Sequence, residues 1–123
     1  MRAGGYMKIA VIGSRGITLT AAQLSRYMPP NCTELVSDGA DGVGQSAAEY
    51  AATHQIKCTV FLPQYEKYGC GAPFERNRQL ADYADLVLAF WDGHSKGISY
   101  VTAYCARTEK SCRVIQISAA SEK

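Results

Sequence analysis

After its first aspartate, the segment 85–91 (DLVLAFW) is apolar at every position. A strand with one solvated face would alternate apolar and polar residues, and this segment does not alternate. It therefore predicts a strand that is buried on both faces, as a central strand of a parallel sheet must be. A parallel sheet needs helices on both sides, so the segment favours an α/β fold.

Four shorter segments are also predicted to form strands: Lys8–Gly13 and residues 33–37, 58–62 and 113–117. Between the strand segments, the spacing of apolar residues is helical. Thr20 and Gln23 fit a capping box that opens the first helix, and the prolines at 29 and 30 stop it. Three later stretches repeat apolar residues every three or four positions: Val43, Ala47 and Ala51; Leu80, Ala81 and Ala84 after Pro73; and Ile98, Val101 and Cys105. Residues 64–72, which include Tyr65 and Tyr68, are predicted to form an irregular loop.

Five strands alternating with four helices predict right-handed crossovers and a Rossmann-like fold. We expect three layers, α/β/α, around a doubly wound five-stranded parallel sheet. No repeat or linker divides the chain, so residues 8–117 are predicted to form one domain, with a flexible leader at 1–7 and a flexible tail at 118–123.

The composition argues against several classes of partner. The 123 residues carry 13 basic and 11 acidic side chains, a net charge of +2, which does not favour nucleic acid or an anionic membrane as the main partner. The opening residues MRAGGYM contain no apolar run, so we do not expect a signal peptide, and no run is long enough to predict a membrane span. The five cysteines show no ligand spacing, so we expect reduced thiols, no metal site and a cytoplasmic location.

Glycine-bearing turns follow three of the predicted strands: residues 13–16 (GSRG), 38–44 (DGADGVG) and 92–97 (DGHSKG). In an open parallel sheet, ligands bind beyond the carboxyl ends of the strands, where these turns lie. Glycine lets the backbone approach an anion closely, and the helices that follow add positive dipole ends. A parallel sheet needs tight turns in any case, but three on one edge favour a binding role. The candidate ligand-binding residues are Gly13, Ser14, Arg15, Asp38, Gly39, Arg76, Asn77, Trp91, Asp92, Gly93, Ser95 and Gly97.

Several of these residues have an alternative structural interpretation. Arg15 either contacts a phosphate or carboxylate in bidentate fashion or is a surface arginine. Trp91 either stacks on a base or belongs to the core. Asp41 either accepts from a ribose or favours a helix N-terminus. Asn77 shares a helix face with apolar residues, so its amide points inward and needs a partner, which is either a ligand or a neighbouring loop. Tyr65 and Tyr68 either wall a pocket or cover the sheet.

In their order along the chain, these motifs resemble the YspA-like branch of the SLOG superfamily. The resemblance spans about residues 8–117 and is carried by IGSRG at 12–16, SDGADGVG at 37–44, YG at 68–69, APFERN at 72–77 and ADLVLAFWDGHSKG at 84–97. It implies a Rossmann-like domain that binds a nucleotide or a nucleotide-derived ligand such as an ADP-ribose-like molecule. Relatives in the superfamily include cytokinin-activating phosphoribohydrolases, a DNA-processing protein and molybdenum cofactor carriers. A homodimer is expected by analogy alone.

The chain departs from the family pattern at three positions. Asp38 stands where the family usually has glycine, Gly44 where it has aspartate, and Ile98 where it has threonine. The phosphoribohydrolases also carry a glutamate in the helix after their glycine turn, whereas residues 99–107 contain no acidic residue.

The sequence therefore favours a nucleotide-binding or sensory domain. An enzyme that hydrolyses an N-glycosidic or phosphoribosyl bond is the alternative, with Asp38 and Asp92 as weak catalytic candidates. A module that binds single-stranded DNA ranks third, because the charge balance and the lack of an aromatic and basic stripe argue against it.

Overall fold

A computed structural model describes residues 7–39 and 42–117. The expected tail at 118–123, most of the expected leader and Asp41 lie outside the described residues. Met7 was expected to belong to the leader. Its N–H donates to Thr33 Oγ1 at 2.7 Å and its carbonyl accepts from Thr33 N at 2.9 Å. Pairing between the first two strand segments therefore begins one residue before the first strand.

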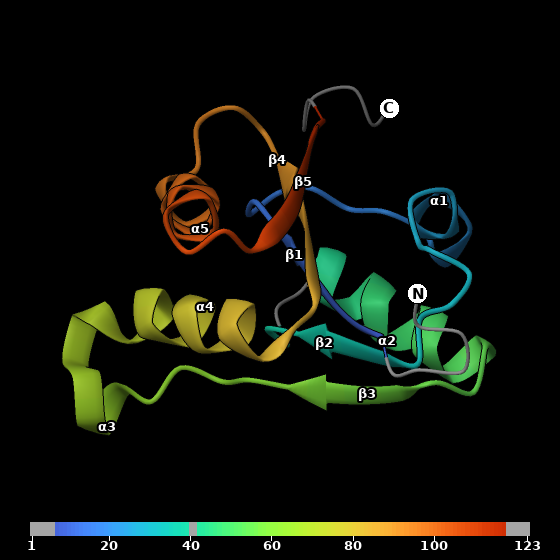
Figure 1. The fold of residues 1–123 in the computed structure, drawn as a ribbon, viewed down its shortest axis with the longest axis horizontal. Coiled ribbons are helices and arrows are strands. Elements are labelled where there is room, and N and C mark those ends of the chain that lie inside the picture. Colours follow the sequence, from blue (N-terminus) through green and yellow to red (C-terminus); the bar gives the residue numbers. More distant parts are fainter. Residues whose placement is uncertain (1–6, 40–41, 118–123) are drawn as a thin grey trace.

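The described chain forms one five-stranded sheet with a helical connection after each of the first four strands (Figure 1). The elements are β1 (Lys8–Gly13), α1 (Ala21–Ser25), β2 (Glu34–Ser37), α2 (Val43–Thr53), β3 (Lys57–Val60), α3 (Tyr65–Tyr68), the 3-10 helix η1 (Gly69–Gly71), α4 (Ala72–Tyr83), β4 (Leu86–Trp91), α5 (Lys96–Arg107) and β5 (Ser111–Gln116).

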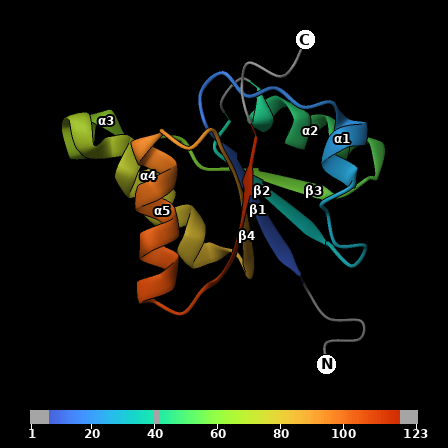
Figure 2. The same cartoon turned by 90° about the horizontal axis from the view of Figure 1, so that it is seen from above.

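All strand pairs are parallel, and the strand order is β3-β2-β1-β4-β5. Figure 2 shows α1 and α2 on one side of the sheet and α4 and α5 on the other. The predicted α/β fold, with a parallel sheet between two helical layers, is confirmed. Because β1 lies next to β4, and their following helices cover opposite faces, the chain connections diverge between the carboxyl ends of these two strands.

The central strands explain why the apolar run 85–91 has no alternation. Within β4, Leu88 and Phe90 pack with α1 and α2, whereas Val87 and Ala89 pack with α4 and α5. All four side chains are fully buried. Both faces of β4 therefore lie in the core, as the sequence predicted.

Two helix starts follow their predicted chemistry. The capping box of α1 is present: Thr20 Oγ1 accepts from Gln23 N at 3.0 Å, and Gln23 Oε1 accepts from Thr20 N at 2.9 Å. Pro73 lies in the first turn of α4. The prediction of an irregular loop at 64–72 is wrong, because this segment contains α3 and η1. A four-residue helix is too short to show an apolar period, which is why the pattern gave no signal.

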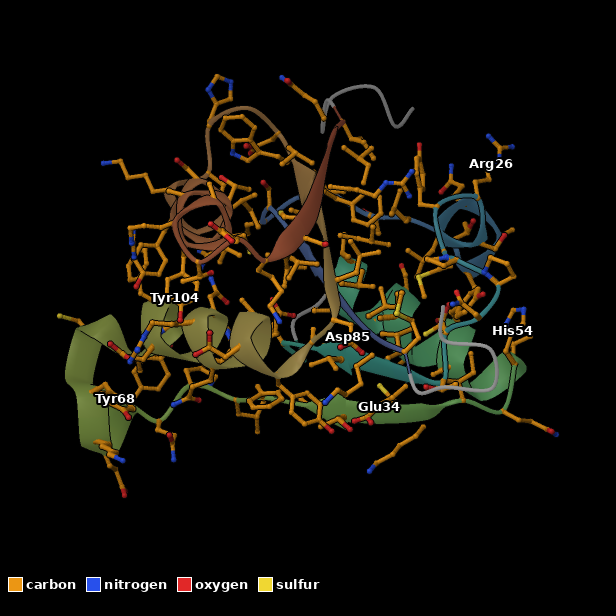
Figure 3. The ribbon with its side chains drawn as sticks, viewed as in Figure 1. Arg26, Glu34, His54, Tyr68, Asp85 and Tyr104 are labelled. Atoms are coloured by element: carbon orange, nitrogen blue, oxygen red, sulfur yellow. The ribbon has the colours of Figure 1, made fainter. Side chains whose placement is uncertain are left out.

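The amino ends of the strands hold a buried carboxylate, on the edge of the sheet opposite the predicted rim. Glu34, the first residue of β2, is fully buried and accepts from Thr59 Oγ1 at 2.5 Å and from the Tyr83 hydroxyl at 2.6 Å. Asp85 lies at the same edge and accepts from Lys8 N at 2.8 Å (Figure 3). Within the described ranges, no helix is long and apolar enough to cross a membrane.

Candidate functional site

A cavity of about 810 Å³ opens at the carboxyl ends of the strands, where the connections after β1 and β4 diverge. We call it the rim cavity. In an open α/β sheet this divergence is the usual place for a ligand. Its walls come from the turn after β1, the turn after β2, the start of α4 and the start of α5. The lining residues are Ile12, Gly13, Ser14, Arg15, Gly16, Ile17, Thr18, Asp38, Gly42, Pro73, Arg76, Asn77, Ser95, Gly97 and Ile98.

Ser14 is fixed at the point of divergence. Its N–H donates to the Phe90 carbonyl at 2.9 Å, and its Oγ accepts from Asp92 N at 3.1 Å, so it joins the ends of β1 and β4. Arg15 follows on the cavity wall and is exposed. Its guanidinium makes no hydrogen bond or ion pair with the described residues. Ser14 is therefore a fixed polar group, whereas Arg15 can reach a bound anion.

The residues of the turn after β2 face two different places: some line the rim cavity, and others pack against β3. Asp38 lines the rim cavity, but Gly39 does not. Gly39 instead lies against β3, where a Cβ atom on it would come within 2.9 Å of Val60. Gly42 also lines the cavity, although sequence reasoning did not select it. It has φ +76°, and a Cβ atom there would lie 2.4 Å from the Ile17 carbonyl oxygen, so only glycine fits.

Three predicted site residues, the last residue of β4 and the two that follow it, do not line the cavity. Asp92 Oδ1 accepts from His94 N at 2.7 Å and Ser95 N at 2.9 Å. These backbone N–H groups, His94 first, hold the pKa of Asp92 below its ordinary value. Trp91 donates from Nε1 to the Ser95 carbonyl at 3.0 Å and packs on the core formed with α4 and α5. Gly93 lies against the side chain of Gln116.

The start of α5 forms the opposite wall. Ser95 is the N-cap of α5, and its Oγ accepts from Ile98 N at 3.4 Å. Among the described residues, no acceptor takes the N–H groups of Lys96 and Gly97. These free donors point along the helix axis from its positive end, an arrangement that favours an anion.

Two residues of α4 complete the cavity. Asn77 is only 7% exposed, so the prediction that it faces inward is confirmed. Its Oδ1 accepts from Arg76 Nε at 2.7 Å, and Arg76 Nη1 donates to the Asp38 carbonyl at 3.4 Å. Arg76 thus ties α4 to the turn after β2.

The tyrosines of α3 do not line the cavity. Tyr65 is exposed, and Tyr68 lies on α3 at an outer end of the molecule (Figure 3). Lys67 Nζ lies 5.3 Å from the centre of the Tyr68 ring.

The rim cavity is rich in donors and positive in charge. Arg15 and Arg76 supply two cations, and Asp38 supplies the single carboxylate among the described lining residues. Sequence reasoning also missed Thr18, which brings a hydroxyl from the same loop as Arg15. Its only sequence signal was its place three residues after Arg15. No group of three or more His, Cys, Asp or Glu side chains in the described part of the chain is placed to hold a metal ion.

Comparisons of this chain with protein-family models, with curated proteins and with solved structures find no match. The fold is therefore established by the structure alone, as a Rossmann-like parallel α/β sheet.

Proposed function

We propose that the rim cavity binds a nucleotide or a nucleotide-derived phosphate ligand. The observation that carries the proposal is the convergence of unpaired donors from three separate elements on one cavity. Arg15 comes from the turn after β1, Asn77 from α4, and the N–H of Gly97 from the start of α5. Such a donor set suits a group that only accepts hydrogen bonds and carries negative charge, as a phosphate does.

The size of the cavity suits more than a bare phosphate. Its volume of about 810 Å³ lies within the range of small-molecule sites, roughly 300–1,000 Å³. Apolar Ile12, Ile17 and Ile98 share its wall with the polar groups. A ligand with a phosphate and a larger, partly apolar body would use both kinds of wall, and a nucleotide has this composition.

The order of motifs supports a place in the YspA-like branch of the SLOG superfamily. Two of the residues that depart from the family pattern, Asp38 and Gly44, lie next to each other in the structure. A Cβ atom on Gly44 would lie 3.0 Å from Asp38 Oδ1. A side chain at position 44 would therefore compete with the Asp38 carboxylate for the same space. Because residue 44 is glycine, there is room for the aspartate side chain at 38. The family pattern has glycine at 38 and aspartate at 44, so this chain carries the same two residue types in exchanged positions, which is consistent with the same turn conformation. The third departure, Ile98, still donates its N–H to Ser95 Oγ.

A thermal-shift screen against AMP, ADP-ribose, NAD and phosphoribosyl compounds tests this proposal. A ligand at a hundred times its dissociation constant should stabilise the fold by about 2.7 kcal/mol. We expect Arg15→Ala and Ser95→Ala to reduce the shift. Arg26→Ala and Thr20→Ala are matched controls: Arg26 is an exposed arginine at the end of α1 (Figure 3), and Thr20 is an N-cap that does not line the cavity. No shift with any compound at millimolar concentration would overturn the proposal.

A second candidate function is the hydrolysis of an N-glycosidic bond, and Asp38 is the observation that favours it. In this reaction water attacks C1′ of the ribose, the bond from C1′ to the base nitrogen breaks, and the base leaves with a proton. A carboxylate beside the sugar stabilises the positive charge that develops on the ring. Asp38 lines the cavity, whereas Asp92 is held by two backbone N–H groups outside it.

Release of free base from AMP, followed by chromatography, tests this second function. We expect Asp38→Asn to abolish release and Asp92→Asn to retain it at the wild-type rate wherever the variant is folded. Saturable binding of AMP without any free base would leave the binding proposal standing and reject hydrolysis.

A further inference from the structure

The side-chain amide of Asn77 has a fixed orientation. Arginine has five N–H donors and no acceptor, so the Asn77 atom that lies 2.7 Å from Arg76 Nε must be the oxygen. The NH₂ group, Nδ2, therefore occupies the other side of the amide plane. Its orientation follows from the chemistry of Arg76.

The Nδ2 group faces the rim cavity beside the start of α5. It lies 3.8 Å from the position that a Cβ atom on Gly97 would take, and both residues line the cavity. The bond to Arg76 is the only hydrogen bond of this amide among the described residues. In the same part of the chain, every side-chain N or O atom fully shielded from solvent has a partner. Nδ2, which has none, must therefore be reached from the cavity.

A donor in this position is unusual, because more than nine-tenths of the Asn77 surface is buried. Buried amide groups normally satisfy both ends within the protein, whereas the NH₂ group of Asn77 is left open to the cavity and to whatever occupies it. The N–H of Gly97, which also lacks an acceptor, lies on the same wall. Two unpaired donors side by side, one from a buried side chain and one from a helix start, together form a site for an acceptor.

We infer that Asn77 Nδ2 donates to a phosphate oxygen of the ligand, and that Arg76 is the positioning residue that fixes this donor. The inference rests on the proposed function and names the groups that select the ligand. Because both groups can only donate, the site selects an acceptor-only oxygen and disfavours a hydroxyl, which would have to place its own hydrogen elsewhere. Arg76 acts through Asn77, and through the Asp38 carbonyl it holds the facing turn at a set distance.

Asn77→Asp is the sharpest test, because it changes one atom. The new carboxylate keeps an oxygen towards Arg76 and pairs with it, so we expect the variant to fold. It replaces the NH₂ donor by an oxygen that repels phosphate. With AMP, ADP-ribose and inorganic pyrophosphate as probes, calorimetry should show binding at least about a hundredfold weaker than in the wild type.

A double-mutant cycle tests the positioning role of Arg76 and stays informative if Asn77→Asp fails to fold. We expect Asn77→Ala and Arg76→Met each to weaken binding by about tenfold or more. Arg76→Met should add less than about threefold when Asn77 is already alanine, because the donor it positions is gone. Arg78→Met is the matched control: Arg78 lies on the same helix, pairs with Glu75 and does not line the cavity.

The possible results separate the two proposals. If the wild type binds none of the probes, this inference and the proposed function both fall. If the wild type binds but the folded Asn77→Asp or Asn77→Ala protein binds within threefold of it, this inference falls and the proposed function stands. If the effects of Arg76→Met and Asn77→Ala are additive, Arg76 contacts the ligand itself and its positioning role is wrong.

Discussion

Gly97 is the glycine of the rim cavity for which the folded chain shows no structural need. It is the second residue of α5, and its φ does not lie in the left-handed region. A Cβ atom added there would meet its nearest neighbours, Asn77 Nδ2 and Ser95 Oγ, at 3.8 and 3.9 Å, which is ordinary van der Waals contact. Gly97→Ala should therefore fit the fold without rearrangement.

The substitution should stabilise the protein and weaken its ligand. Alanine is favoured over glycine in a helix interior by about 0.5–1 kcal/mol, which is the upper bound for the first turn of α5 and corresponds to a rise in Tm of up to about 5 °C for a domain of this size. The same methyl group would occupy the space next to two polar groups of the cavity wall. A ligand oxygen would have to move away from them, and we expect binding to weaken by at least about tenfold, or about 1.4 kcal/mol.

The assay combines a thermal melt without ligand and calorimetry with the best probe of the screen. Gly71→Ala is the matched control, because Gly71 is the N-cap of α4, has φ −84°, has no atom within 4 Å of an added Cβ and does not line the cavity. It should leave binding unchanged. A Tm that falls after Gly97→Ala would show a structural need for the glycine. Unchanged affinity would show that the ligand does not approach this helix start.

Three further predictions concern packing, buried charge and pH. Gly13→Ala should destabilise the fold by about 1–3 kcal/mol in urea denaturation, because its Cβ atom would lie 2.4 Å from Val43 Cγ2 and push α2 away from β1; an unchanged midpoint would contradict this. Tyr83→Phe should cost about 1.5–3 kcal/mol, since it removes a donor to the fully buried Glu34 carboxylate, and a loss below about 0.5 kcal/mol would be inconsistent with that bond. The pKa of Asp92 is lower in the folded state than its ordinary value of 3.8, so its stabilising effect is present above that value and is lost as the pH falls through the folded pKa. Melts from pH 6 to pH 2 should therefore show a steeper acid loss for the wild type than for Asp92→Asn, and parallel curves would refute this.

The fold could be predicted from the sequence because a strand that is buried on both faces is apolar at successive positions, and this pattern is visible in the sequence. A strand such as β4, with Val87 and Ala89 on one face and Leu88 and Phe90 on the other, cannot alternate. That pattern identifies a parallel sheet, and a parallel sheet brings the turns after its strands to one edge. Ser14, Asp38 and Ser95, which come from three different turns, accordingly line one cavity together with Gly97 at the start of α5.

The direction of each side chain within a turn could not be predicted. Asp92 and Ser95 lie in one turn, yet Asp92 is drawn to backbone N–H groups of that turn while Ser95 lines the cavity. Gly93 packs against the side chain of Gln116, which leaves little room for a side chain at position 93. Gln116 belongs to β5 and comes close only when the sheet is complete. These outcomes depend on contacts between segments far apart in the chain, which local residue patterns do not record.

The glycines themselves now fall into two groups that the sequence could not separate. Most of those in the predicted turns have a reason within the protein, because a side chain there would meet another part of the chain: Gly13, Gly39, Gly42 and Gly93. Glycine-rich turns on the sheet edge are therefore mainly architecture and are weak support for a ligand on their own. The case for binding depends on what architecture leaves unexplained, namely Gly97 and the NH₂ group of the largely buried Asn77, which has no partner among the described residues. Because these two residues belong to different helices and lie against each other on the cavity wall, a single ligand oxygen would account for both.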